Sequence, residues 1–274
     1  MRLHNKLFIF SLLMLSFIPT GANAKPYLLR YKFNAGQKDV YKTMMTVQVS
    51  LPGQPAGNGM FAVSGNGDTI YHVLRIKPSG SAIVDISSPN FVMTNTSTPA
   101  PHNVKTVRAL ISPRGEMSQV TFPSTMSRGP LMTSIVNPQS FSTTSALLPL
   151  KAVMVGNTWT MYRTNFVRGA KPIKVVTRFL KIVNVNHIPT VLLRSVYTIP
   201  VSTKVMQPGG VGQLQIKGTI HVTSLENFAP DQGKLVKMNL TGGGSVAVLA
   251  AGSQKGAPNM NMNLQINVTM DSTH

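Results

Sequence analysis

Two methionines, Met260 and Met262, stand one residue apart near the C-terminus, in a run where asparagine fills the alternate positions. Thioether sulfur is a soft ligand that binds Cu(I), so this Met-x-Met pair is the candidate metal site of the chain. The alternative is structural. Both side chains lie on the strand face that Leu264 and Ile266 continue, where they would pack in a core. The pattern favours core packing over a copper site.

Carboxyl groups are scarce in this chain. The seven acidic residues are Asp39, Asp68, Asp85, Glu116, Glu226, Asp231 and Asp271. Hydrolysis by paired carboxylates needs two acids that converge on one bond, and no motif indicates such a pair. Asp68, Glu116 and Asp231 fall in or beside predicted turns, where acidic residues shape the backbone. Only Asp85 lies inside a strongly apolar predicted strand, and we assign it no catalytic role.

Histidine, serine and glycine form no recognised catalytic motif. The histidines beyond residue 24 are His72, His102, His187, His221 and His274. No HExxH or His-x-His pair indicates zinc, and no Gly-x-Ser-x-Gly sequence indicates a hydrolase nucleophile. The glycine runs 209–212 and 242–244 lead into no helix with Lys-Ser or Lys-Thr, so we expect hairpin turns or bulges there. We predict no catalytic residues, no cofactor-binding residues and no cofactor.

The elements that would position these residues are strands, because apolar and polar residues alternate with period two. The alternation is sustained over 41–50, 213–222 and 261–270. Such segments predict half-buried antiparallel strands with one apolar face toward a core. Further strands are expected at 27–34, 68–77, 81–87, 104–112, 157–168, 172–184, 189–199, 234–240 and 245–251.

Turn chemistry separates the predicted strands. Residues that favour tight turns gather at 64–68, 78–80, 113–115, 208–210 and 231–233. The segment 123–150 is different, because it is rich in Ser, Thr and Pro and lacks sustained alternation. We interpret it as a linker or crossover with at most one short helix, near 131–136. The single tryptophan, Trp159, follows this segment and is expected to anchor the core of the second half.

The N-terminus has the three parts of a secretory signal peptide. Arg2 and Lys6 give a positive start, an apolar run follows over 7–18, and Ala22-Asn23-Ala24 fits a small-x-small cleavage site. About a dozen apolar residues are too few for a spanning helix, which needs roughly 20. We therefore expect cleavage after residue 24, a periplasmic or secreted protein, and no transmembrane segment in what remains.

Composition limits the partners. The chain has 26 Lys and Arg against 7 Asp and Glu, and it contains no Cys, which excludes disulfides, thiolate metal sites and lipid attachment at cysteine. A strongly basic chain favours polyanions such as anionic lipid or an anionic envelope polymer. Export makes nucleic acid the least natural of these, so no nucleic-acid partner is expected. A generally basic proteome would also explain the charge.

The order of features suggests an internal duplication. Phe33-Asn34-Ala35-Gly36 and Val153-Met154-Val155-Gly156 each precede a long predicted strand, and similar strand–turn–strand series follow both. The predicted organisation is a signal peptide at 1–24, a first β half at 25–122, a linker at 123–150 and a second β half at 151–274. The predicted fold is all-β and antiparallel, a curved sheet, half-barrel or paired sandwich.

Two stretches carry a resemblance to known proteins. They are Leu29-Arg30-Tyr31-Lys32-Phe33 with Gly36 and Tyr41, and Leu148-Pro149-Leu150-Lys151 with Val153, Val155 and Gly156-Asn157-Thr158-Trp159. Both are similar to stretches in uncharacterised exported bacterial β-rich proteins. The general plan also resembles the lipoprotein-carrier half-barrels of the LolA/LolB type. The resemblance implies a curved antiparallel sheet and carries no catalytic residues over.

Three functions follow as hypotheses. The first is an exported, non-enzymatic binding or carrier protein for an apolar or anionic amphiphilic ligand, held on the apolar face of the sheet. The second is a structural cell-envelope protein that adheres to anionic polymers by charge. The third is a hydrolase with a dispersed site, which would bring a histidine and an acid within hydrogen-bond reach of a serine or a water.

Overall fold

A computed structural model describes residues 25–50, 61–95, 99–101, 104–121, 146–165, 171–206, 213–251 and 260–273. These residues form thirteen strands and contain no helix, so the all-β prediction is confirmed. The strands are β1 (Lys38–Ser50), β2 (Phe61–Ile76), β3 (Ala82–Ser88), β4 (Val92–Asn95), β5 (Pro99–Pro101), β6 (Val104–Ile111), β7 (Met117–Thr121), β8 (Thr158–Arg163), β9 (Ile173–Val185), β10 (Ile188–Met206), β11 (Gln213–Ala229), β12 (Lys234–Ala251) and β13 (Met260–Ser272).

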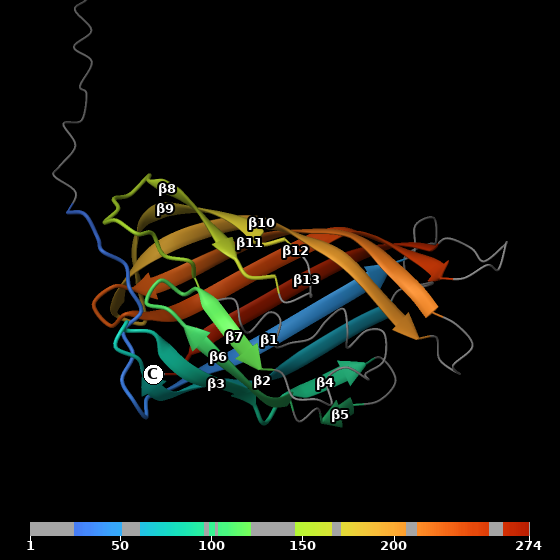
Figure 1. The fold of residues 1–274 in the computed structure, drawn as a ribbon, viewed down its shortest axis with the longest axis horizontal. Coiled ribbons are helices and arrows are strands. Elements are labelled where there is room, and N and C mark those ends of the chain that lie inside the picture. Colours follow the sequence, from blue (N-terminus) through green and yellow to red (C-terminus); the bar gives the residue numbers. More distant parts are fainter. Residues whose placement is uncertain are drawn as a thin grey trace, which may run out of the picture.

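All thirteen strands belong to one antiparallel sheet, which curls into a barrel that is nearly closed (Figure 1). The strand order is β7-β6-β3-β2-β1-β13-β12-β11-β10-β9-β8, with β4 and β5 attached beside β2. The last strand, β13, therefore lies between β1 and β12. Because eleven strands alternate in direction along this path, the two edge strands β7 and β8 run the same way. We call the gap between them the seam.

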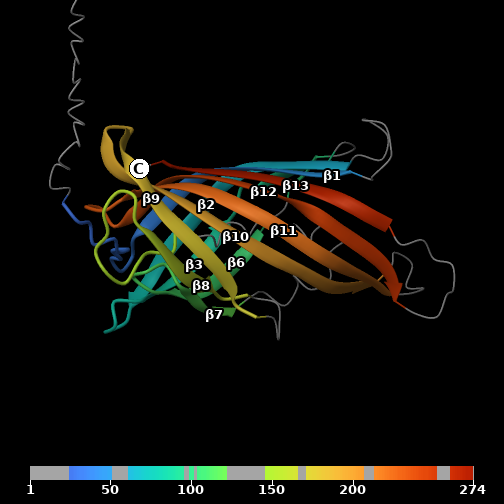
Figure 2. The ribbon, with the colours of Figure 1, turned by 90° about the horizontal axis from the view of Figure 1, so that it is seen from above.

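The strands differ greatly in length, and this shapes the barrel. The strand β11 has 17 residues and β8 has 6, so they span roughly 56 Å and 20 Å at about 3.3 Å per residue. Figure 2 shows β1 and β10–β13 running lengthwise as one long curved wall. The short strands β3, β6, β7 and β8 lie against one end of that wall in Figure 1. That end we call the turn end.

Tight turns connect the strands at the turn end. The turn between β9 and β10 has two residues, Asn186 and His187, with φ of 50° and 64°. These are the left-handed values that a two-residue hairpin requires. Turns at 78–80, 113–115 and 231–233 also lie here, as the sequence predicts. The predicted turn at 208–210 lies outside the described residues.

Two glycine-containing segments that the sequence predicts as turns or bulges are strand interiors. Residues 64–68 lie within β2, and residues 242–244 lie within β12. Close packing explains the first case: a Cβ on Gly65 would lie 2.4 Å from the ring of buried Phe91, and one on Gly67 would lie 2.6 Å from the backbone oxygen of Asn90. These glycines bring the chain after β3 against β2 and do not reverse it.

The prediction of a strand at 27–34 is also wrong. Residues 28–34 form no strand, and Tyr27 makes an isolated bridge with Val153. This N-terminal segment crosses the turn end, where Tyr31 N donates to Pro113 O at 2.7 Å and Lys32 N donates to Gly233 O at 3.0 Å. Buried Leu29 packs with Phe179, Phe228 and other residues of a small hydrophobic cluster that fills this end.

The predicted linker at 123–150 and its helix near 131–136 fall largely on residues 122–145, outside the described residues, as does the predicted signal peptide. Strands from both predicted halves join one sheet, and the duplication stays a prediction. No helix of the described residues is long and apolar enough to cross a membrane.

Candidate functional site

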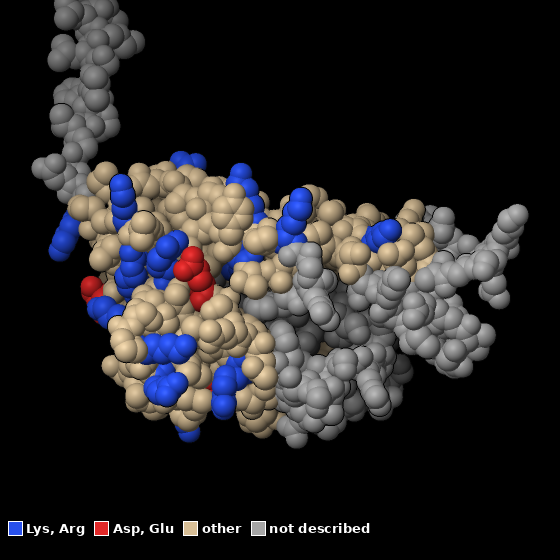
Figure 3. Space-filling model, in the orientation of Figure 1, with Lys and Arg blue, Asp and Glu red and all other residues tan. Residues whose placement is uncertain are grey.

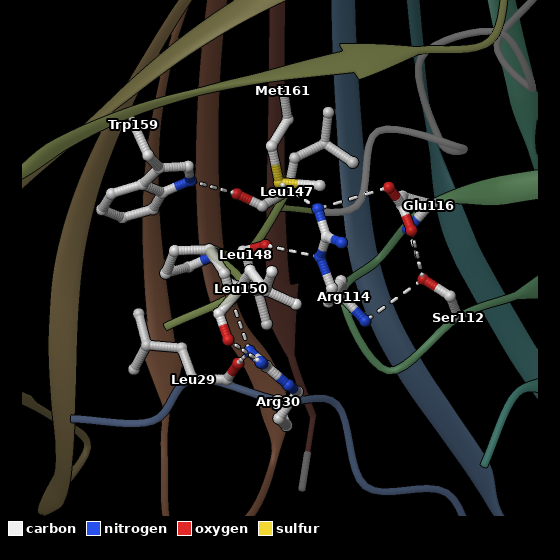
Figure 4. Close-up of polar contacts among 11 residues, drawn as sticks. Leu29, Arg30, Ser112, Arg114, Glu116, Leu147, Leu148, Leu150, Trp159 and Met161 are labelled. Atoms are coloured by element: carbon white, nitrogen blue, oxygen red, sulfur yellow. Dashed lines mark hydrogen bonds and ion pairs between the residues drawn. The ribbon is translucent and has the colours of Figure 1, made fainter. Parts of the chain in front are cut away.

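Residues 146–150, which we call the seam segment, lie between the edge strands at the turn end. Residues 146–149 are buried although they form no strand, so their backbone groups need partners outside a ladder. Four side chains supply partners, as Figure 4 shows in part, and Leu148 N donates to the backbone oxygen of Arg114 at 2.9 Å. Trp159 Nε1 donates to Leu147 O at 2.9 Å, and Ala146 N donates to the Tyr31 hydroxyl at 3.0 Å. The predicted anchoring role of Trp159 thus includes a specific backbone contact.

Two arginines complete the seam. One guanidinium nitrogen of Arg30 donates to Leu29 O at 2.5 Å and Pro149 O at 2.6 Å, and the other donates to Leu150 O at 2.5 Å. On the other side, Arg114 Nε donates to Leu148 O at 3.4 Å, and its terminal nitrogen lies 3.5 Å from Glu116 Oε1. Burial lowers the pKa of Arg30, and the neighbouring Arg114 lowers it further.

Hydrogen bonding also links the two edges directly, since Thr164 Oγ1 donates to Met117 O at 3.1 Å. A second contact joins the Arg114 guanidinium to Met161 Sδ at 3.5 Å. The seam segment and these contacts close the barrel wall where β7 and β8 do not pair. The seam is therefore a structural closure, and its polar groups are occupied by one another.

The interior of the barrel holds a second set of polar groups, which we call the lumen polar cluster. It comprises Thr177, Ser195, Ser224, Glu226 and Arg163. Pairing places Thr177 beside Ser195 and Ser195 beside Ser224, on the inward face of β9, β10 and β11. The Thr177 and Ser195 hydroxyls lie 2.9 Å apart. All three hydroxyl residues are about 1% exposed.

Glu226 is the most unusual member of the cluster. It is 1% exposed, and its Oε1 accepts a 2.6 Å hydrogen bond from Ser224 Oγ. Its Oε2 is buried without a hydrogen-bond partner among the described residues. Desolvation raises the pKa of Glu226. The Ser224 hydrogen bond, the Arg163 charge and the nearby Ser195 hydroxyl each lower this pKa, but by less. A carboxyl with a raised pKa keeps its proton more readily and can donate a hydrogen bond.

Arg163 ends β8 and reaches back toward the other cluster members. Its guanidinium carbon lies 5.2 Å from the ring centre of buried Tyr197, a cation–π geometry. Its positive charge also lowers the pKa of Tyr197, opposing the larger effect of desolvation, which raises that pKa. Burial raises the pKa of Tyr31 in the N-terminal segment. The nearby Glu226 raises this pKa further, and the Arg163 charge lowers it.

Beyond the cluster, away from the turn end, the inward faces of the long wall are apolar. The register between β10 and β11 places their inward side chains in rows: Tyr197 lies beside Val222, Ile199 beside Ile220, and Val201 beside Gly218. The inward side chains of this section are Val47, Val49, Ile199, Val201, Ile216, Ile220, Val246, Val248, Met262, Leu264 and Ile266. Together the lumen polar cluster and these rows make one wall that is polar at its inner end and apolar along its length.

A separate pocket lies under the N-terminal segment at the turn end. Tyr31, Tyr41, Tyr71 and Phe33 line it, with Asp39 and other residues of β1–β3, β6, β12 and β13. The space open to water-sized molecules is about 40 Å³. This holds a few waters at most, whereas ligand pockets measure roughly 300–1,000 Å³. It is not the site of a large ligand.

The structure separates the residues that the sequence singled out. Met262 is 9% exposed and packs in the main core, and Met260 lies two residues before it in β13, with its side chain outside the described part. The described residues contain no group of three or more His, Cys, Asp or Glu that could hold a metal. Asp85 lies on the outer face of β3 and pairs with Arg108 at 2.7 Å.

Sequence reasoning missed Glu226. The predicted strand ended at 222, whereas β11 continues to Ala229, and the even-numbered positions from Ile216 to Phe228 face inward. Extending the alternation past residue 222 would have placed the glutamate in the barrel interior. The described hydrogen bonds of Ser224 and Glu226 involve no histidine, whereas His221 contacts Thr198 on the outer face.

Comparisons with known proteins add little. No family model matches the chain, and no curated protein matches it. Among solved structures, the chain is similar to lipovitellin, from a structure concerned with lipid–protein interactions, with a TM-score of 0.48 and 10% identity. The match covers 88% of this chain and 25% of that one. A TM-score this low carries no argument for function.

Proposed function

We propose that the protein is an exported, non-enzymatic binding protein that holds an amphiphile inside the barrel. The apolar part of the ligand lies along the inward rows of β1 and β10–β13. Its polar group lies at the lumen polar cluster. The observation that carries the proposal is the single wall that joins these two surfaces, because an amphiphile presents the same order of polar and apolar parts.

The length of that wall supports an extended ligand. The strands β10, β11 and β12 have 19, 17 and 18 residues, against 5 and 6 in the edge strands β7 and β8. Described edge strands therefore oppose only part of the apolar wall. Apolar surface contributes about 25 cal/mol per Å² when it leaves water, so an acyl chain that inserts among these buried side chains would gain free energy from the burial of its own surface.

The polar end selects a ligand that accepts hydrogen bonds. The raised pKa of Glu226 favours its protonated form, which can donate through Oε2, and Arg163 adds positive charge at the same end of the lumen. A carboxyl, ester or phosphate group offers acceptor oxygens to both. A ligand whose polar group only donates would leave the Arg163 charge without compensation from the ligand.

The test is binding of a fluorescent fatty acid, cis-parinaric acid, to protein produced from the full sequence, together with mass spectrometry of extracted lipids. Val47→Phe adds volume on the inward face of β1, and Met44→Phe adds it on the outward face of the same strand, where Met44 is 63% exposed. We expect Val47→Phe to weaken binding by roughly tenfold or more and Met44→Phe to leave it unchanged. A thermal melt of each variant establishes that it is folded.

If Val47→Phe does not fold, Ile199→Phe, at a half-buried lumen position, replaces it. An empty protein that binds no fatty acid, or equal affinities for inward and outward variants, would overturn the proposal. The envelope protein held by charge would then be the better hypothesis.

A further inference from the structure

The outer face of the wall formed by β8–β11 combines exposed apolar side chains with cations. We call it the outer patch. Its residues are Tyr162, Lys174, Val176, Arg178, Arg194, Val196 and Leu225. Pairing makes them neighbours: Tyr162 with Lys174, Val176 with Val196, and Arg178 with Arg194, which in turn lies beside Leu225. Cation and apolar side chain therefore alternate along β9 and along β10.

The apolar members are unusually exposed for such residues. Tyr162 is 63% exposed, Val196 43%, Leu225 37% and Val176 36%. Scattered exposed apolar residues are ordinary, but these four occupy neighbouring positions on adjacent strands. Contact between this apolar surface and water is unfavourable in free energy.

Among the described residues, no ion pair joins a cation of the outer patch to a carboxylate. From residue 158 to residue 229 the sequence contains nine Lys and Arg and one acid, Glu226, which faces the lumen. Acids elsewhere neutralise neighbouring cations: Lys42 pairs with Asp68 at 2.6 Å and Lys237 with Asp271 at 2.9 Å. Figure 3 shows the same imbalance on one face, with many blue side chains and few red ones.

We infer that the outer patch docks on an anionic lipid bilayer. Positive charge attracts it to anionic head groups, and the apolar side chains enter the interfacial region, which Tyr and aliphatic groups favour. A soluble polyanion would use the cations and leave the four apolar side chains in water. The mixture on one face therefore fits a membrane surface better than a polymer.

This inference goes beyond the lumen proposal and needs no bound ligand, since it concerns the opposite face of the wall. The two are tested apart, because vesicle binding can be measured on protein with an empty lumen. If both hold, the outer patch brings the barrel to the surface from which an amphiphile is taken or to which it is given.

The experiment is co-sedimentation of the protein with phosphatidylglycerol vesicles and with phosphatidylcholine vesicles. The triple variant Lys174→Gln, Arg178→Gln, Arg194→Gln removes the three cations of the outer patch. The control Lys38→Gln, Arg75→Gln, Lys151→Gln removes three exposed cations outside it, so both variants lose the same net charge. We expect the first to weaken binding to phosphatidylglycerol by on the order of 100-fold and the control to weaken it far less.

A second variant tests the apolar contribution. Val176→Ser, Val196→Ser changes no charge and should also weaken vesicle binding, while binding to soluble heparin, a polyanion without a bilayer, stays the same. Two results would overturn the inference: equal losses from the two triple variants, which would indicate attraction by net charge, or a serine variant that binds vesicles as well as the unaltered protein. Circular dichroism of every variant establishes that the sheet is intact.

Discussion

The indole Nε1 of Trp159 donates to the carbonyl oxygen of Leu147 at 2.9 Å, and this contact attaches the seam segment to β8. Trp159→Phe keeps the aromatic volume and removes the donor. Leu147 is 1% exposed, so its carbonyl would lose a partner in a buried setting. We expect a loss of about 1–3 kcal/mol in the free energy of unfolding, measured by chemical denaturation. Tyr162→Phe, on the exposed face of the same strand, should change it by under about 0.5 kcal/mol.

A glycine at the β6–β7 turn tests how tightly the seam segment is packed. Gly115 has φ of +80°, and a Cβ there would lie 2.1 Å from the backbone oxygen of Ala146. Gly156 has φ of +90° with nothing within 4 Å of an added Cβ, so it is the matched control. Gly156→Ala should cost about 1–2 kcal/mol from backbone strain, and Gly115→Ala clearly more. Equal melting temperatures for the two variants would show that the seam segment shifts without cost to make room for the added methyl group.

The buried carboxyl of Glu226 predicts a pH effect on stability. Burial raises its pKa in the folded state above the usual value of a glutamate, so between the usual value and the folded pKa the folded state binds more protons than the unfolded state. Stability therefore falls as pH rises through this window. Glu226→Gln keeps an acceptor for Ser224 and does not ionise, so the variant should become more stable than the unaltered protein toward higher pH.

Denaturant midpoints measured at a series of pH values check this prediction. The difference between Glu226→Gln and the unaltered protein should grow with pH and then level off above the folded pKa. A difference that stays constant from acid to neutral pH would contradict the raised pKa. Ser224→Ala should raise that pKa further, because it removes the 2.6 Å hydrogen bond that favours the ionised form.

The ion pair on the outer face of β3 and β6 should contribute little. Arg108 Nε lies 2.7 Å from Asp85 Oδ1, and its terminal nitrogen lies 2.9 Å from Oδ2, but the Arg108 side chain is 58% exposed. Exposed pairs contribute little and weaken with salt. Asp85→Asn should lower the free energy of unfolding only slightly, with a smaller effect at high salt. A large loss would mean that Asp85 has a role the outer face does not explain.

Local pattern predicts most strands of this protein and few of its contacts between distant segments. The alternation over 41–50 and 261–270 corresponds to β1 and β13, because most inward positions are apolar and most outward ones polar; Thr43 faces inward and Met44 faces outward as exceptions. The predictions of turns or bulges at Gly65 and at 242–244 are wrong, because the structural role of these glycines depends on what packs against them. The N-terminal segment shows alternation as well, yet its hydrogen bonds go to turns near residues 113 and 233.

The candidate site was harder to predict than the fold. Glu226 is one acid in a run of Ser, Leu and Asn, and its burial follows only from how far β11 extends. Its neighbours Ser195 and Arg163 come from other strands, and no spacing along the chain links the three. The metal candidates Met260 and Met262 illustrate the reverse case, since a visible motif coincides with ordinary packing of Met262 in the core.

The position of β13 has a consequence for how the chain acquires its structure. Thr273 Oγ1 donates to Val40 O across 233 positions of sequence, and β13 pairs with β1 on one side and β12 on the other. Until β13 has been made, β1 keeps one edge without a partner, and β1 and β12 cannot join into one wall. Joining of the wall therefore waits for the last of the thirteen strands. Contacts this distant in sequence also favour slow folding.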